Sequence, residues 1–105
     1  MLPFDEHTPT YDLHEVQQLV GQGELSCVVT NAALDGAAAL GLDRTELIEA
    51  VLALDEGNFY KSMPSERFPD LWQDVYHLRF VGIELYIKLQ IDSAGFAVVI
   101  QCKRK

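Results

Sequence analysis

At the centre of the chain stand two runs, Phe59-Tyr60-Lys61-Ser62-Met63 and Trp72-Gln73-Asp74-Val75-Tyr76, joined by a loop that contains Pro64 and Pro69. Before Gly57 the apolar residues recur at three- and four-residue spacing, which is typical of helices. After Gly57 they alternate with polar residues, which is typical of strands. The period therefore predicts a helical N-terminal half and an extended C-terminal half.

Three helices are predicted before Gly57. The first runs from Asp12 to Gly21, the second from Thr30 to Leu40, and the third from Asp43 to Leu54. The first and third begin with Asp-x-x-Glu, a variant of the capping box. The second is rich in alanine, so we expect it to lie close against its neighbours. Residues 25–29 fit a short strand or the lead-in to a helix, and residues 1–9 are interpreted as a loosely attached arm.

Four strands are predicted after Gly57, at residues 59–63, 72–80, 83–91 and 96–102. Turns are predicted at Val81-Gly82 and Ser93-Ala94-Gly95. The fold class is therefore α+β, with an antiparallel meander packed on one face by the N-terminal helices. The last strand is apolar on both faces, which predicts a central position or a covering helix. Residues 1–105 form a single domain of common size.

Charge is divided unevenly along the chain. Residues 1–56 carry one cation, Arg44, against eleven acidic residues, whereas residues 57–105 carry seven cations against five acidic residues. The total is −8, which on its own is unfavourable for a nucleic-acid-binding protein. The segregation indicates different partners for the two halves, or an acidic helical surface that serves solubility.

Other signals exclude several classes of protein. No signal peptide or spanning segment is recognised, so we expect a cytoplasmic location. Cys27 and Cys102 are expected to be reduced and packed. The three histidines lack metal-ligand spacing, and the glycines form no phosphate or dinucleotide fingerprint. No metal or cofactor is expected.

The alternating strand at residues 83–91 directs Tyr86, Lys88 and Gln90 to the face of the sheet away from the helices, about 7 Å apart in successive steps. Lys61 and Gln73 from neighbouring strands are expected to converge beside Tyr86. Cations, an amide and a phenol suit an anionic ligand, and they suit phosphodiester chemistry in particular. An ordinary solvated sheet face is the alternative.

The chain resembles the motility quorum-sensing regulator (MqsR) toxin family, whose members are small RNA-cleaving toxins with a RelE-like fold. The resemblance covers most of the chain and is carried by Phe59-Tyr60-Lys61-Ser62-Met63, Trp72-Gln73-Asp74-Val75-Tyr76, Tyr86-Ile87-Lys88, Gln18-Leu19-Val20 and Leu40-Gly41-Leu42-Asp43. It implies a metal-independent endoribonuclease that cleaves single-stranded mRNA at short GC-containing sites such as GCU. It also implies a cognate antitoxin, MqsA-like or other, as protein partner.

The resemblance further implies roles for individual residues. The catalytic positions fall on Lys61, Gln73, Tyr86 and Lys103. In this interpretation the RNA 2′-hydroxyl attacks the adjacent phosphate, and Lys61 and Lys103 stabilise the phosphorane. Gln73 positions the RNA, and Tyr86 or a lysine moves protons. The residues predicted to bind RNA around them are Tyr60, Tyr76, Arg79, Lys88 and Arg104. The alternative is a regulatory or protein-binding module whose nuclease activity is weakened, as the acidic half suggests.

Overall fold

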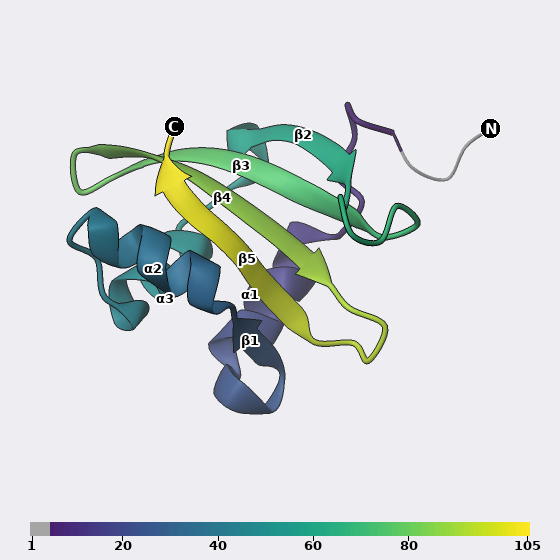
Figure 1. The fold of residues 1–105 in the computed structure, drawn as a ribbon, viewed down its shortest axis with the longest axis horizontal. Coiled ribbons are helices and arrows are strands. Elements are labelled where there is room, and N and C mark those ends of the chain that lie inside the picture. Colours follow the sequence, from purple (N-terminus) through teal and green to yellow (C-terminus); the bar gives the residue numbers. More distant parts are fainter. Residues whose placement is uncertain (1–4) are drawn as a thin grey trace.

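The computed structural model describes residues 5–105, so the first four residues of the predicted arm lie outside the described part. The elements, in chain order, are α1 (Leu13–Gly21), η1 (Gly23–Leu25), β1 (Cys27–Val29), α2 (Asn31–Ala39), α3 (Arg44–Leu52), η2 (Glu56–Asn58), β2 (Phe59–Pro64), β3 (Trp72–Phe80), β4 (Ile83–Ile91) and β5 (Ala97–Arg104). The predicted helices and strands are confirmed, as is the α+β class (Figure 1).

The strands form one sheet in the order β1-β5-β4-β3-β2. The pairs β2–β3, β3–β4 and β4–β5 are antiparallel, which confirms the meander. The sheet is nevertheless mixed, because β1 pairs with β5 in parallel. Its three residues are too few to show a period, which is why residues 25–29 could not be assigned from the sequence. The addition of β1 places β5 inside the sheet, as its apolar composition predicts.

The three helices contribute to a single hydrophobic core with one face of the sheet. The core residues of the strands include Tyr76, Leu85, Ile87, Leu89, Val99 and Cys102, and those of the helices include Val16, Ala33, Leu47 and Val51. Asp43 and Glu46 form the predicted capping box at α3, while Asp12 caps α1 through the N–H of His14. Cys27 and Cys102 are both free and buried, as expected. Within residues 5–105, no helix is long and apolar enough to span a bilayer.

Helix α2 lies directly on β5, and Gly36 allows the close approach. A Cβ atom built at Gly36 would lie 1.8 Å from the carbonyl oxygen of Cys102, a distance that no side chain can occupy. The alanines on the same helix, Ala33 and Ala37, are also fully buried. The small-residue composition of α2 thus determines how near the helix stands to the sheet.

The N-terminal arm is held on the sheet by the buried carboxylate of Asp74, which accepts hydrogen bonds from the backbone N–H groups of Thr10 (3.0 Å) and Tyr11 (2.9 Å). The hydroxyls of Thr10 and Ser62 are 2.7 Å apart, and the Ser62 N–H donates to the carbonyl of Glu6. Thr10 and Tyr11 directly follow residues 1–9, the predicted loosely attached arm, and Asp74, only 1% exposed, needs the hydrogen bonds that they donate. In the described part of that arm, residues 5–9 are exposed, and the Glu6 carbonyl accepts one hydrogen bond from the sheet.

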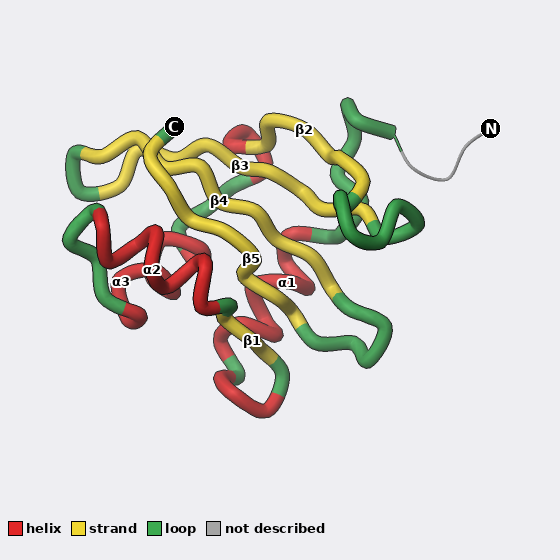
Figure 2. The backbone as a smooth tube through the Cα atoms, viewed as in Figure 1, coloured by secondary structure: helices red, strands yellow, loops and turns green. Residues whose placement is uncertain are grey.

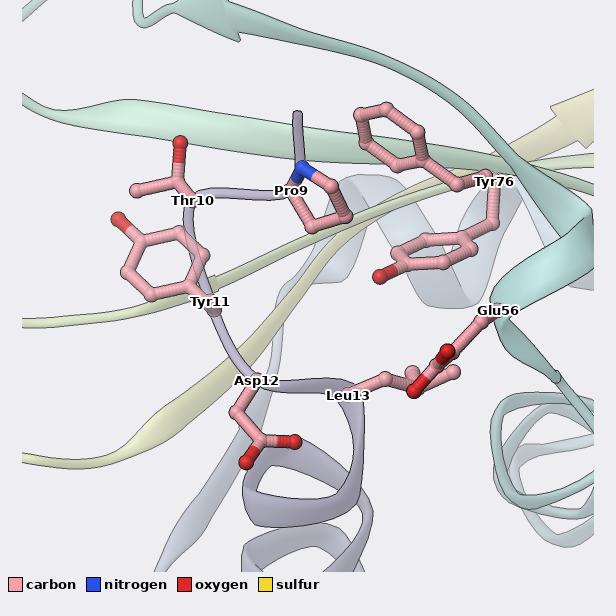
Figure 3. Close-up of a pocket in the computed structure, with 8 residues that line it drawn as sticks. Pro9, Thr10, Tyr11, Asp12, Leu13, Glu56 and Tyr76 are labelled. Carbon is pink, nitrogen blue, oxygen red and sulfur yellow. The ribbon is translucent and has the colours of Figure 1, made fainter. Parts of the chain in front are cut away.

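The arm leaves a cavity of about 450 Å³ where it passes the start of α1 and η2 (Figure 3). The ring of Tyr76 faces this cavity from β3, and the side chain of Glu56 faces it from η2. It lies on the helix side of the sheet, because Tyr76 belongs to the core.

We predict that Gly36→Ala destabilises the protein by about 1–3 kcal/mol or more, because the added methyl group meets the Cys102 carbonyl. Urea denaturation measures this change. Gly21→Ala is the matched control, since the described residues leave open space around a Cβ at that position. Equal stability of the two variants would contradict the close contact between α2 and β5.

We predict that Asp74→Ala releases the arm and lowers the free energy of unfolding by about 1–3 kcal/mol, because two N–H groups lose their acceptor. Amide hydrogen exchange at Thr10 and Tyr11 should accelerate in the variant. Asp70→Ala, in the exposed loop before β3, is the control and should leave exchange in the arm unchanged. Unchanged protection of Thr10 and Tyr11 in the Asp74 variant would refute this account.

Candidate functional site

The face of the sheet away from the helices, called the open face below, carries the candidate site in three rows across the strands, next to a further row with Arg79 and Glu84. The strand register gives the rows as Tyr60, His77, Tyr86 and Lys103; then Lys61, Val75, Lys88 and Gln101; then Met63, Gln73, Gln90 and Val98. Successive rows are about 7 Å apart. The open face therefore brings together Tyr60, Lys61, Tyr86, Lys88 and Lys103, as predicted.

Lys61 reaches the open face because of a bulge in β2. Phe59 pairs with Tyr76 on the core side, and the next paired residue is Lys61, opposite Val75. Tyr60 is the extra residue, and its ring stacks on His77 with centroids 4.2 Å apart. Consecutive residues of a regular strand point to opposite faces, so without the bulge Tyr60 and Lys61 would be separated by the sheet.

Lys103 reaches the same face through a second bulge. On β5, Val99 pairs with Leu89 and Gln101 pairs with Lys88, which leaves Ile100 as the extra residue. Lys103 then pairs with Tyr86, and its Nζ lies 4.6 Å from the centre of the Tyr86 ring. In a regular strand Lys103 would share the face of Val99, which is buried in the core.

Tyr86 stands at the centre of this arrangement. Lys103 lies over its ring, the Nζ of Lys88 is 5.9 Å from the ring centre, and the His77 ring is 5.9 Å away on the neighbouring strand. Burial, and then the neighbouring phenol of Tyr60, raise the pKa of Tyr86 above its ordinary value. Tyr86 is therefore a neutral phenol at neutral pH, suited to donate a proton or a hydrogen bond.

The cations influence one another. Burial lowers the pKa of Lys88, and the charges of Lys103 and Lys61 lower it further, while Glu66 opposes them. Burial also lowers the pKa of His77 below 6.5, with Lys105 and Lys61 acting in the same direction. Glu84 opposes that shift. His77 is consequently a neutral imidazole at pH 7, which is the form that accepts a proton.

His77 is the residue that sequence reasoning missed. Its alternation with Gln73 and Val75 places it on the open face, but a single histidine without metal-ligand spacing gave no reason to select it. The structure places it between Tyr60 and Tyr86. Gln101, beside Lys88, was also absent from the prediction.

Gln73 lies farther from Tyr86 than expected. It is opposite Gln90, and its Nε2 donates to Gln90 Oε1 at 3.2 Å. Gln90 is four residues from Tyr86 on β4, a separation of about 13 Å. Gln73 therefore belongs to the edge of the site, one row beyond Lys88.

Tyr76 was predicted to bind RNA, and its position corrects that prediction. It is 2% exposed on the core side of β3, where its ring meets the edge of Phe59 at 5.7 Å. Burial and the nearby carboxylate of Asp74 raise the pKa of its hydroxyl. A side chain enclosed in the core cannot stack on a base from the open face. Alternation along β3 already separates Tyr76 from Gln73, Val75 and His77, whereas its aromatic type and its place in the motif led to the wrong prediction.

The two predicted arginines lie at the margin. Arg79 is exposed and forms an ion pair with Glu84 at 3.4 Å. Arg104 pairs with Leu85, whose side chain is in the core, so Arg104 lies on the opposite face from Lys103. Its predicted contact with RNA at the open face is therefore not supported by its position.

No group of three or more His, Cys, Asp or Glu side chains within residues 5–105 is arranged to hold a metal ion. The open face itself supplies three lysines, a neutral imidazole and the phenols of Tyr60 and Tyr86. Such groups bind an anion, move protons and stabilise developing negative charge.

The profile of the family described as "Motility quorum-sensing regulator, toxin of MqsA" matches residues 8–104. The chain belongs to this family. The mRNA interferase toxin MqsR of Escherichia coli (strain K12) is 36% identical over 87 residues, which cover 83% of this chain and 87% of the relative. The resemblance that the motifs around Lys61 and Gln73 indicate is thereby confirmed.

Proposed function

We propose that this MqsR-family protein is an endoribonuclease toxin that cleaves single-stranded mRNA at short GC-containing sites such as GCU. The observation that carries the proposal is the placement of Lys61, Lys88 and Lys103 around Tyr86 and His77 on one exposed face. Family membership supports it, since the relative from E. coli is named an mRNA interferase toxin.

The proposed reaction is attack by the RNA 2′-hydroxyl on the adjacent phosphorus, without a metal ion. His77 takes the proton of the 2′-hydroxyl, and the new P–O bond closes a 2′,3′-cyclic phosphate as the bond to the 5′-oxygen breaks. Tyr86 or a lysine gives the leaving 5′-oxygen its proton. Lys61 and Lys103 stabilise the charge of the phosphorane, because fixed cations act most strongly where charge develops in the transition state.

The negative total charge is compatible with this function because binding depends on the local field. The helical half carries most of the acidic residues, and its helices pack on the opposite face of the sheet. The open face presents mainly cations and amides to a phosphate backbone. Phosphate contacts of this kind weaken steeply with salt, so the interaction with RNA should do the same.

An antitoxin is the proposed protein partner. The family description pairs its toxins with MqsA, and we infer a cognate MqsA-like or other antitoxin for this chain. A second candidate function, a protein-binding module with weakened nuclease activity, is favoured by the acidic N-terminal half. In that case overexpression would be harmless to cells.

We predict that Lys61→Ala and Tyr86→Phe each slow cleavage of a GCU-containing RNA by about 100-fold or more, because each removes a group that acts on the reacting phosphate. Gel analysis of the products, with and without EDTA, measures the rate. Arg44→Ala is the matched control, since it also removes one positive charge but Arg44 is an exposed residue at the start of α3.

Full activity of both variants would refute the proposed site, and activity abolished by EDTA would refute the metal-independent reaction. Expression in cells separates the two candidate functions. Growth arrest that Lys61→Ala removes would exclude the weakened module, whereas harmless expression of the wild-type protein would favour it.

We predict that the cleavage rate falls on the acidic side of pH 6.5 because His77 becomes protonated there. Its pKa is lowered, so the neutral, proton-accepting form predominates at pH 7 and is lost as the pH drops through the lowered pKa. A pH–rate profile measures this acidic limb. In His77→Gln the limb should disappear, and the rate at pH 7 should fall about 100-fold. An unchanged acidic limb in that variant would assign proton transfer to another group.

A further inference from the structure

A hollow of about 640 Å³ adjoins the cationic rows of the open face. Its base is the third row, where Gln73, Gln90 and Val98 lie side by side, together with the bulged Ile100. The loop between β2 and β3 and the turn between β4 and β5 lie at the same end of the sheet (Figure 2), and residues of both line the hollow. Its lining includes Arg67, Phe68 and Asp92.

The polar part of the hollow is an amide pair with spare hydrogen-bonding capacity. Gln73 Nε2 donates to Gln90 Oε1, which leaves Gln73 Oε1 as an acceptor and Gln90 Nε2 as a donor. No buried side-chain nitrogen or oxygen of residues 5–105 lacks a partner, so these two atoms remain accessible from the hollow. A donor and an acceptor side by side match the edge of a nucleobase.

The remaining walls suit a flat aromatic ring. Val98 and Ile100 provide apolar surface beside the amides, and Phe68 projects from the loop with 62% of its surface exposed. The guanidinium of Arg67 lies 6.0 Å from the centre of the Phe68 ring. Aromatic and guanidinium groups of this kind stack on unpaired bases.

We propose that this hollow binds one unpaired base of the RNA, next to the phosphate that is cleaved, and thereby contributes to the choice of cleavage site. The inference rests on the proposed function. Gln90 is two residues from Lys88 on β4, about 7 Å, so a nucleotide whose phosphate lies on the lysines has its base within reach of the hollow. Gln73 then acts as a positioning residue that holds the base, and this agrees with its distance from Tyr86.

The test combines a base deletion with an amide deletion. RNAs that carry one abasic nucleotide at each position around the cleavage site are cleaved by the wild-type protein and by Gln90→Leu. At one position, removal of the base should slow cleavage by the wild-type protein about tenfold, which is the size expected for a lost base contact. At the same position, removal of the base should slow cleavage by Gln90→Leu less than about threefold. Phe68→Ala should reduce the penalty at the same position. Gln18→Leu, at an exposed position of α1, is the matched control and should keep the wild-type pattern.

Equal abasic penalties in the wild type and in Gln90→Leu at every position would overturn the inference while leaving the nuclease intact. Thermal melting verifies that Gln90→Leu is folded.

A second measurement is independent of cleavage, because it uses a 2′-deoxy oligonucleotide, which lacks the attacking hydroxyl. Its addition should shift the side-chain amide NMR signals of Gln73 and Gln90. If these signals shift in a protein that cleaves no RNA, the base site stands and the proposed nuclease function fails; if they stay unmoved at saturation, the base site is refuted.

Discussion

Two irregularities of strand pairing determine the chemistry of the open face. The extra residue in β2, Tyr60, and the extra residue in β5, Ile100, each reverse the alternation of the strand that follows. Lys61 and Lys103 are thereby brought to the face that carries Tyr86. Without the bulges both lysines would point toward the hydrophobic core, where a charged ammonium group is strongly unfavourable. The apolar residues around each bulge stabilise this register, because a one-residue slip of the strand would move their side chains out of the core.

The same arrangement explains how a protein of net charge −8 can present a cationic surface. The helices cover one face of the sheet and belong to the half of the chain that holds eleven of the 16 acidic residues, whereas the strands supply the lysines on the other face. The close contact of Gly36 with β5 and the hydrogen bonds of the arm to Asp74 fix the covered side. The sheet thus separates the two charge populations that the sequence shows as two halves.

Much of the fold was predictable from periodicity, because Ile83 to Ile91 alternate strictly and the helix starts carry capping residues. The parallel strand β1 was not, since three residues show no period and its pairing with β5 is a long-range contact. Motif resemblance selected Lys61, Tyr86 and Lys103, but alternation alone would have separated them, because bulges leave no clear signal in a single sequence. Tyr76 shows the opposite error: its motif indicated a functional residue, while its face of the strand makes it a core residue.

The lysines have a consequence beyond the attraction of phosphate. Burial, and then the charges of Lys105 and Lys61, lower the pKa of His77 and so hold the imidazole neutral before RNA binds. A phosphate on the open face would offset those charges and raise the pKa of His77 again. The imidazole would then be a stronger proton acceptor when the substrate is present than when it is absent, and the 2′-hydroxyl beside it would be the nearest source of that proton. A cationic surface and a neutral base are therefore compatible in one site, because Lys61, a proposed phosphate ligand, also helps to keep the base neutral.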